Sequence, residues 1–178
     1  MGLKLVKKAV LGGDPGRDGG LVGITEDGAV HVWRTQNFTH VEEAAEELKD
    51  FCSRYQVLKA GYEAVHAMPR DRKKLARAFT FAKNTGRIIG WMDMLGVEVE
   101  YIQIAEWQRH YGVYGLASSY ELMGFSRSQA ETRAKTTIYE VAQQHIASVK
   151  FTKDVADAML ICKYVAERER LCFLNTVL

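Results

Sequence analysis

Cysteine is scarce in this sequence and long apolar runs are absent, and each scarcity argues against a class of protein. The three cysteines, Cys52, Cys162 and Cys172, form no Cys-x-x-Cys pair, so neither a disulfide framework nor a thiolate zinc site is expected. Such usage is typical of a reducing compartment. No stretch approaches the roughly 20 apolar residues that span a bilayer, so no membrane partner is expected. The first residues lack the apolar core of a signal peptide, which together with the cysteines predicts a cytoplasmic protein.

Net charge is also small and decides little by itself. A formal charge of +2 on 178 residues neither requires nor excludes a nucleic-acid partner, which has to be judged from local clusters of lysine and arginine. Apolar residues make up 47% of the chain and charged residues 26%, the composition of an ordinary globular protein. No linker, repeat or low-complexity segment interrupts the sequence, so we expect one domain over residues 1–178.

Five short segments have the apolar patterns of strands. They are residues 4–13, 20–25, 29–35, 57–65 and 97–104. The second and third are joined by Glu26-Asp27-Gly28, and an Asp-Gly turn between apolar runs predicts a hairpin. The first three strands are therefore expected to form an antiparallel meander.

Helical spacing of apolar residues predicts most of the remaining elements. Helices are expected at about residues 39–52, 72–95, 106–111, 128–146 and 154–168, and a loop at 112–127. The strand–helix–strand units in the middle of the chain require right-handed crossovers and parallel pairing. We therefore expect an α/β fold with a mixed five-stranded sheet, an antiparallel meander plus parallel strands, flanked by helices.

Two of these helices carry more specific expectations. Thr39-His40-Val41-Glu42 has the pattern of a capping box and marks the start of the first helix. In the helix at 72–95, an apolar stripe runs through Leu75, Phe79, Ala82, Gly86, Ile89 and Met92. Gly86 and Gly90 lie four residues apart on one face. Because glycine inside a helix is costly, we expect this face to pack tightly on the sheet.

Acidic residues stand at positions where a carboxylate is costly to bury. Asp14 ends the first apolar strand, and Glu63 lies inside the fourth. Asp154 and Asp157 stand three apart at the start of the last helix, where such residues share a face. Each acid also has an ordinary explanation. The first belongs to an Asp-Pro-Gly turn, the second could face solvent from a half-buried strand, and the last two could cap the helix and stabilise its dipole.

Considered together, the four acids predict a metal site. A carboxylate on the first strand, one on the fourth and a pair on the last helix would converge at one end of the sheet. Several carboxylates at close quarters repel one another and stay ionised only with cations among them. Hard oxygen ligands without a histidine-rich cluster suit Mg²⁺ or Mn²⁺. Two such ions about 4 Å apart can activate a water and stabilise the leaving oxygen of a phosphodiester.

Three stretches of the sequence resemble the RuvC-type Holliday junction resolvases of the RNase H-like superfamily, nearer to the phage-encoded branch than to the cellular one. They are LGGDPGRDGGLVGI, YEAVHAMPRDRKKLARAFTFAKNTGRIIGWMDMLGVEVEYIQIAEWQRHYG and DVADAMLI. The resemblance extends over nearly the whole chain and implies an RNase H-like fold. It also implies a homodimeric endodeoxyribonuclease that cuts four-way DNA junctions with two symmetric nicks, in a bacterial or phage-infected host cell.

The same resemblance assigns the site residues. Asp14 matches the strand-one aspartate of the family, and Glu63 matches the glutamate of its second motif. Asp154 and Asp157 match the last motif, an acid or histidine followed by x-x-Asp-Ala. The resemblance implies that these four residues are catalytic and hold two Mg²⁺ or Mn²⁺ ions in each active site.

The sequence departs from the family at two positions. Gly13 stands where an apolar β-branched residue is usual, which would either loosen the strand or admit a neighbouring group. His66 stands where the cellular enzymes have an aromatic residue that wedges into the junction. An imidazole can also stack on a base, so His66 stays a candidate for DNA contact.

Basic residues cluster directly after the strand that carries Glu63. The segment PRDRKKLAR, residues 69–77, would ordinarily be a solvated helix face, but its place beside that glutamate favours DNA contact. The residues expected to contact phosphates are Arg70, Arg72, Lys73, Lys74, Arg77, Lys83, Arg87, Arg133 and Lys135. Lys135 also falls where the family has a lysine near the active site. Contacts of this kind supply affinity without reading the base sequence.

Three alternatives share parts of this pattern. An RNase H-like nuclease acting on RNA–DNA hybrids or flaps would use the same metal chemistry, so the motifs barely separate it. A non-catalytic junction-binding protein would not require all four acids. An actin-like ATPase or sugar kinase also places a glycine-rich hairpin after a strand-one aspartate, but that fold needs two such domains and this chain has one.

Overall fold

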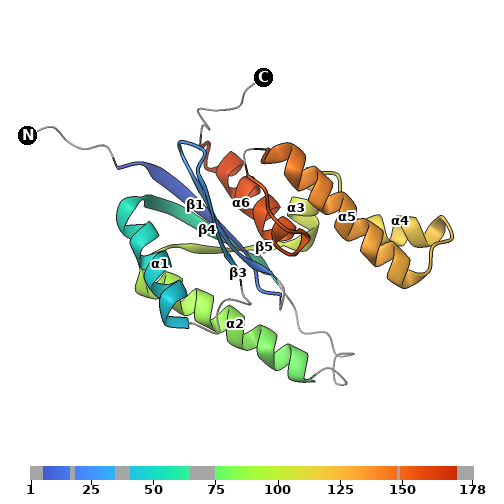
Figure 1. The fold of residues 1–178 in the computed structure, drawn as a ribbon, viewed down its shortest axis with the longest axis horizontal. Coiled ribbons are helices and arrows are strands. Elements are labelled where there is room, and N and C mark those ends of the chain that lie inside the picture. The colour runs from blue at the N-terminus through green and yellow to red at the C-terminus, as the bar shows by residue number, and fades with distance from the viewer. Residues whose placement is uncertain (1–5, 17–18, 35–40, 65–74, 148, 172–178) are drawn as a thin grey trace, which may run out of the picture.

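Five strands form the central sheet in a computed structural model that describes residues 6–16, 19–34, 41–64, 75–147 and 149–171 (Figure 1). The strands are β1 (Lys8–Asp14), β2 (Gly20–Thr25), β3 (Val30–Arg34), β4 (Gln56–Ala64) and β5 (Val99–Gln103). Their order is β3-β2-β1-β4-β5, with β2 antiparallel to both β1 and β3, and β4 parallel to both β1 and β5. The expected mixed sheet is therefore confirmed.

Helices cover both faces of this sheet. They are α1 (Val41–Arg54), α2 (Leu75–Met94), α3 (Ile104–His110), α4 (Leu116–Leu122), α5 (Arg127–His145) and α6 (Ala156–Arg168), with a short 3-10 helix, η3, at Lys153–Val155. Helices α1 and α2 lie on one face, and α6 lies on the other with α3 and α5 beside it (Figure 1). The capping box expected at residues 39–42 begins outside the described residues. Within the described ranges, no helix is long and apolar enough to cross a bilayer.

Each face of the sheet has its own buried core, because strand side chains alternate between the two faces. Ala9 and Leu11 of β1 belong to the core that includes Leu48 and Phe51 of α1. The other core is built around α6, in which eight of the 13 residues are buried. Because α6 is a core helix, the carboxylate in its first turn, Asp157, is unexpected on packing grounds alone.

Glycines let the backbone of α6 approach the sheet closely. A Cβ on Gly12 of β1 would stand 2.2 Å from the backbone nitrogen of Cys162 and 2.4 Å from its Cα. A Cβ on Gly61 of β4 would stand 2.4 Å from the side chain of Val165. The Cys162 thiol also donates a hydrogen bond to the carbonyl of Val10 at 3.5 Å. Helix α6 therefore rests directly on the backbones of β1 and β4.

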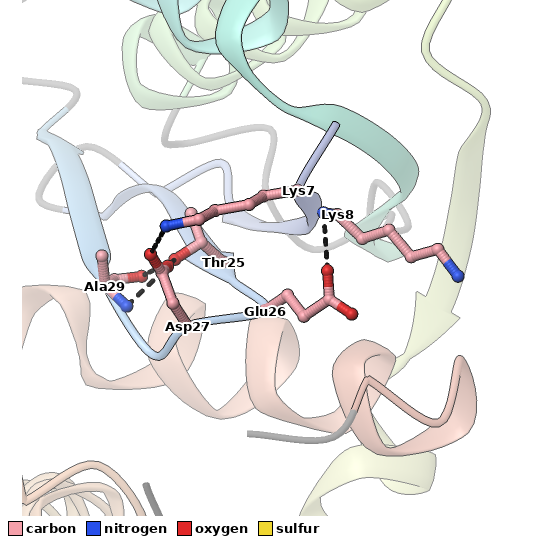
Figure 2. Close-up of polar contacts among 6 residues, drawn as sticks. All are labelled: Lys7, Lys8, Thr25, Glu26, Asp27 and Ala29. Atoms are coloured by element: carbon pink, nitrogen blue, oxygen red, sulfur yellow. Dashed lines mark hydrogen bonds and ion pairs between the residues drawn. The ribbon is translucent and has the colours of Figure 1, made fainter. Parts of the chain in front are cut away.

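The turn between β2 and β3 is tied to the first residues of β1 (Figure 2). Lys7 forms an ion pair with Asp27, and the backbone N–H of Lys8 donates to the Glu26 carboxylate at 3.1 Å. The hydrogen bond from Lys7 is the main reason that the pKa of Asp27 falls to about 2. Gly28 has a φ of +82°, the left-handed conformation that this tight turn requires. The hairpin expected at residues 26–28 is confirmed.

The expected loop at residues 112–127 is wrong, because α4 occupies part of it. None of its seven residues is fully buried, and a segment this short gives too few apolar positions to predict a helix from their spacing. It packs on α5 instead, and the hydroxyls of Tyr120 and Thr137 form a hydrogen bond of 2.9 Å between the two helices. We therefore attribute the formation of this helix to its tertiary contact with α5.

The face of α2 that meets the sheet differs in part from the expectation. Met92 of the expected stripe is buried, but so is Ile88 outside it, whereas Phe79 is 73% exposed and Gly86 is exposed. No described atom comes within 4 Å of the place a Cβ would take on Gly86 or Gly90, so the expected tight packing of these glycines on the sheet is wrong. Two opposite stripes of α2 are rich in apolar or small residues. Helical spacing alone therefore does not show which of them is buried.

We expect Gly12→Ala to lower the free energy of unfolding by about 1–3 kcal/mol, because the added methyl group would push α6 away from β1. Urea denaturation followed by circular dichroism measures this change. The control is Ser118→Ala on the exposed surface of α4, which should change the stability by less than about 0.5 kcal/mol. Equal stability of Gly12→Ala and the wild type would show that the close contact is unnecessary.

Candidate active site

The ends of β1 and β4 carry the two strand acids. The parallel register pairs Gly13 with Tyr62, so the next residues, Asp14 and Glu63, come side by side. Gly61 faces α6, and Glu63 stands two residues further along the same strand. Asp14 likewise stands two residues after the β1 glycine that contacts α6. Because alternate strand residues share a face, both carboxylates lie on the α6 side of the sheet.

The first turn of α6 supplies a third carboxylate. Five residues of helix, about 7.5 Å, separate Asp157 from Cys162, and two residues of strand, about 6.6 Å, separate Asp14 from Gly12. Since Cys162 contacts Gly12 and the charge of Asp14 acts on Asp157, the first turn of α6 lies near the end of β1. Asp157 is accordingly close enough to interact electrostatically with both Asp14 and Glu63. We call these three residues the acidic cluster.

Burial and mutual repulsion raise the pKa of two carboxyls in the acidic cluster. The pKa of Glu63 rises to about 8, first because the group is largely removed from water and then because Asp14 and Asp157 are negative neighbours. The pKa of Asp157 rises to about 7 through burial and the charge of Asp14, while Lys135 of α5 opposes the rise. Without a cation, the cluster therefore tends to hold protons at neutral pH.

Asp14 also has the turn role that its sequence context indicates. The backbone N–H of Gly16 donates to Oδ1 of Asp14 at 2.9 Å. Gly19 lies so close that a Cβ there would stand 2.6 Å from Oδ2. The loop backbone thus surrounds this carboxylate. Because a carboxylate has two oxygens with several acceptor sites, a turn role and a place in the acidic cluster are compatible.

Asp154 differs from the acidic cluster in its exposure and in the element that carries it. It is exposed and lies in η3, whereas Asp157 is partly buried in the first turn of α6. Val155 between them has φ −106° and ψ 6°, so the expectation of a single helix beginning at Asp154 is wrong. Neither η3 nor α6 has a side-chain cap in the described structure, so Asp154 is not a helix cap. Among the described groups, Asp154 does not contribute to the pKa shifts of Glu63 or Asp157.

The space left by Gly13 is filled by an aromatic ring. A Cβ on Gly13 would stand 2.5 Å from two ring carbons of Tyr62, which lies beside it on β4. The glycine therefore admits a neighbouring group, one of the two consequences expected for this departure. Burial raises the pKa of the Tyr62 phenol, and the charge of Asp14 adds to the rise.

Trp107 is a neighbour of the site that the sequence analysis did not identify. It is fully buried on α3, and its indole N–H lies close enough to Glu63 to lower the pKa of that carboxyl. The contact falls short of hydrogen-bond geometry, since the N–H has no partner within the described ranges. A signal was available in the sequence. Residues just past the end of β5 gather at the same sheet edge as the end of its parallel neighbour β4.

The residues expected to contact DNA fall into three groups. Outside the described residues lie His66, Arg70, Arg72, Lys73, Lys74 and the side chain of Arg77. Lys83 and Arg87 lie on α2, across the sheet from α6. Arg133 places its guanidinium 4.1 Å from the ring centre of Phe125. Lys135 lies on α5, where its charge reaches the acidic cluster.

The acidic cluster has the donor chemistry for a hard divalent cation. Its carboxylates offer only oxygen ligands, which Mg²⁺ and Mn²⁺ prefer, and a cation would remove the repulsion between them. In the arrangement of the described residues, no group of three His, Cys, Asp or Glu side chains can hold an ion as it stands. The carboxylates would therefore have to draw together when an ion binds.

Comparison with solved structures identifies the fold. The structure of T. thermophilus RuvC in complex with Holliday junction substrate matches with a TM-score of 0.53 at 15% identity, over 92% of this chain and 96% of that chain. A structure of Thermus thermophilus RuvC matches with a TM-score of 0.49 at 14% identity, over the same shares. Comparison of the sequence with protein families and with curated proteins gives no match. The chain has a RuvC-type, RNase H-like fold, as its three motifs predict.

We expect the metal-free protein to lose stability as the pH rises from about 4 to about 8. In this range the unfolded chain releases protons that folded Glu63 and Asp157, with pKa values of about 8 and 7, still hold, so rising pH favours the unfolded state. Glu63→Gln should weaken this dependence and raise the midpoint of thermal unfolding at the upper end. The exposed Glu140→Gln is the control. A wild-type curve parallel to that of Glu63→Gln would contradict the raised pKa.

Proposed function

We propose that this protein is a divalent metal-dependent endonuclease that resolves four-way DNA junctions, and acts on other branched DNA as well, by symmetric nicking. The observation that carries the proposal is the acidic cluster, in which β1, β4 and α6 bring three partly buried carboxylates together at one end of a RuvC-type sheet. The similarly folded T. thermophilus RuvC is described in complex with Holliday junction substrate, which supports the same class of DNA here.

The acidic cluster accounts for the hydrolytic part of this function. Asp14, Glu63 and Asp157 would hold Mg²⁺ or Mn²⁺, two ions in each active site, with Asp154 as a further ligand. When bound, such ions polarise the scissile phosphate and make water a better nucleophile at neutral pH. The protein contributes three carboxylates on rigid elements and partly out of water, where their attraction for a cation is stronger than in bulk solvent.

Lys135 is suited to bring the DNA backbone to the acidic cluster. It is exposed on α5, and its charge already acts on Asp157. A cation beside the carboxylates offsets their repulsion of the DNA phosphates. Residues 65–77, which follow β4, would add further phosphate contacts. Contacts of this kind do not read bases, which suits an enzyme that selects the shape of its DNA.

A nicking assay with several substrates tests the proposal. A four-way junction, a splayed arm, a flap and an RNA–DNA hybrid are each incubated with Mg²⁺, Mn²⁺ or EDTA. The proposal expects symmetric nicks in the junction with either metal and none with EDTA. Cleavage of only the hybrid or the flap would establish an RNase H-like nuclease of different specificity. Binding of the junction without cleavage would establish a non-catalytic junction-binding protein.

Neutral replacements in the acidic cluster should abolish nicking but not junction binding. We expect Asp14→Asn, Glu63→Gln and Asp157→Asn each to slow cleavage by more than about 100-fold, because each removes a charged metal ligand. Mobility-shift gels should show unchanged or tighter binding, since a negative charge near the phosphates is lost. Cleavage by Asp14→Asn at nearly the wild-type rate would contradict the assignment.

A metal titration of two further variants compares the roles of the two aspartates near the start of α6. Asp154→Asn should raise the Mn²⁺ concentration needed for half-maximal nicking and recover part of its activity at high Mn²⁺, in keeping with the exposed position of Asp154. Asp157→Ala should not recover at any concentration. The same unrecoverable loss in both variants, or an unchanged titration for Asp154→Asn, would contradict the graded roles.

A homodimer is part of the proposal, because resolving a four-way junction takes two opposed cuts. The described part of one chain has one acidic cluster, and two-fold symmetry would place identical sites on opposite strands. The outer face of α2 offers a surface for this contact. Phe79 is 73% and Met94 87% exposed, and no described atom covers Gly86 or Gly90. Glycines on this face would let two helices approach closely.

We expect Gly86→Arg to raise the dissociation constant of the dimer by more than about tenfold, since a long charged side chain would separate the two helices. Sedimentation at micromolar concentration measures the change, and paired nicking should fall with it. The matched control is Leu122→Arg, which changes a residue that is 90% exposed on α4. A wild-type protein that sediments as one chain with full resolving activity would contradict the dimer.

A further inference from the structure

The indole N–H of Trp107 is a buried donor without a hydrogen bond in the described part of the chain. The hydroxyls of Tyr62 and Thr85 share this status, but those two groups lie next to each other. The indole N–H of Trp107 acts on the carboxylate of Glu63, whose pKa it lowers, although the two make no hydrogen bond. Buried donors without a partner are rare in folded proteins, so this one calls for an explanation.

The fold fixes the direction of this donor. Strand β5 pairs in parallel with β4 and places Ile102 opposite Glu63, and α3 begins directly after β5. Trp107 therefore stands about one helical turn beyond the strand end. Its ring is fully buried in the core that includes Ile138 and Met159. A ring held by packing on this scale keeps its N–H pointed in one direction.

We propose that Trp107 is a positioning residue for Glu63. One carboxylate oxygen of Glu63 accepts a hydrogen bond from the indole N–H, and the other oxygen is then directed toward Asp14 and Asp157. The inference rests on the proposed metal site in the acidic cluster. A carboxylate is a strong acceptor for such a donor, because hydrogen bonds to charged groups are shorter and stronger than neutral ones. Partners of this kind orient metal-binding side chains and increase their affinity for the ion.

The indole N–H resonances test the contact directly. The chain has three tryptophans, Trp33, Trp91 and Trp107, so a proton–nitrogen correlation spectrum shows three indole signals. The signal lost in Trp107→Phe identifies Trp107. We expect that signal to shift in Glu63→Gln and on addition of Mg²⁺ to the wild type, while the other two stay in place. An unmoved signal in Glu63→Gln would overturn the proposal, and this arm leaves the buried tryptophan intact.

Calorimetric titration with Mn²⁺ tests the consequence for the site. Trp107→Phe keeps an aromatic ring in the core but removes the donor, and we expect it to weaken Mn²⁺ binding roughly tenfold. Trp33→Phe is the matched control, because Trp33 is buried in the opposite core, and it should leave the affinity unchanged. Equal Mn²⁺ affinity in Trp107→Phe and the wild type would overturn the positioning role.

The experiments can reject the positioning role of Trp107 and the proposed nuclease activity independently of each other. A protein that binds Mn²⁺, and whose Trp107 signal responds to Glu63→Gln, but that cuts no branched DNA, would keep the positioning role and overturn the nuclease. A protein that cuts four-way junctions normally, but whose Trp107 signal does not respond, would keep the nuclease and overturn the positioning role.

Discussion

Close packing of α6 on the glycines of β1 and β4, through its backbone at Gly12 and through the Val165 side chain at Gly61, is the constraint on which the site depends. A Cβ on Gly12 would stand only 2.2 Å from the backbone nitrogen of Cys162, so the helix could not lie this close to a residue with a side chain. A close-packed interior does not absorb such a group without moving the helix. Because Asp157 is part of that helix, its distance from Asp14 and Glu63 is set by backbone contact rather than by its own side chain.

The acidic cluster places like charges together on elements that cannot easily separate them. Two carboxylates stand at neighbouring strand ends, and the third stands on a helix with eight buried residues. Burial first, and the negative neighbours after it, raise the pKa values of Glu63 and Asp157 to about 8 and 7. Two apolar cores, one on each face of the sheet, offset this unfavourable arrangement. Local conflict of this kind within an otherwise consistent fold is typical of functional sites.

The helices on the two faces of the sheet contribute side chains to different candidate surfaces. Helix α5 places Lys135 where its positive charge acts on the cluster, and α3 places Trp107 against Glu63. Helix α2 covers the opposite face of the sheet, and no described residue covers its Phe79 or Gly86. The candidate active site and the candidate contact between chains thus belong to opposite helix layers, so substitutions in one layer can be read independently of the other.

The sequence by itself determined the mixed sheet, the hairpin at residues 26–28 and the acids of the cluster, because apolar alternation, an Asp-Gly turn and an acid at a strand end are local features. It did not determine which stripe of α2 is buried, since both are compatible with helical spacing. Nor did it separate Asp154 from Asp157, because that depends on the backbone at Val155. Only the tertiary structure decided which acids meet and that Trp107 faces Glu63, because distances between segments remote in sequence are set by packing.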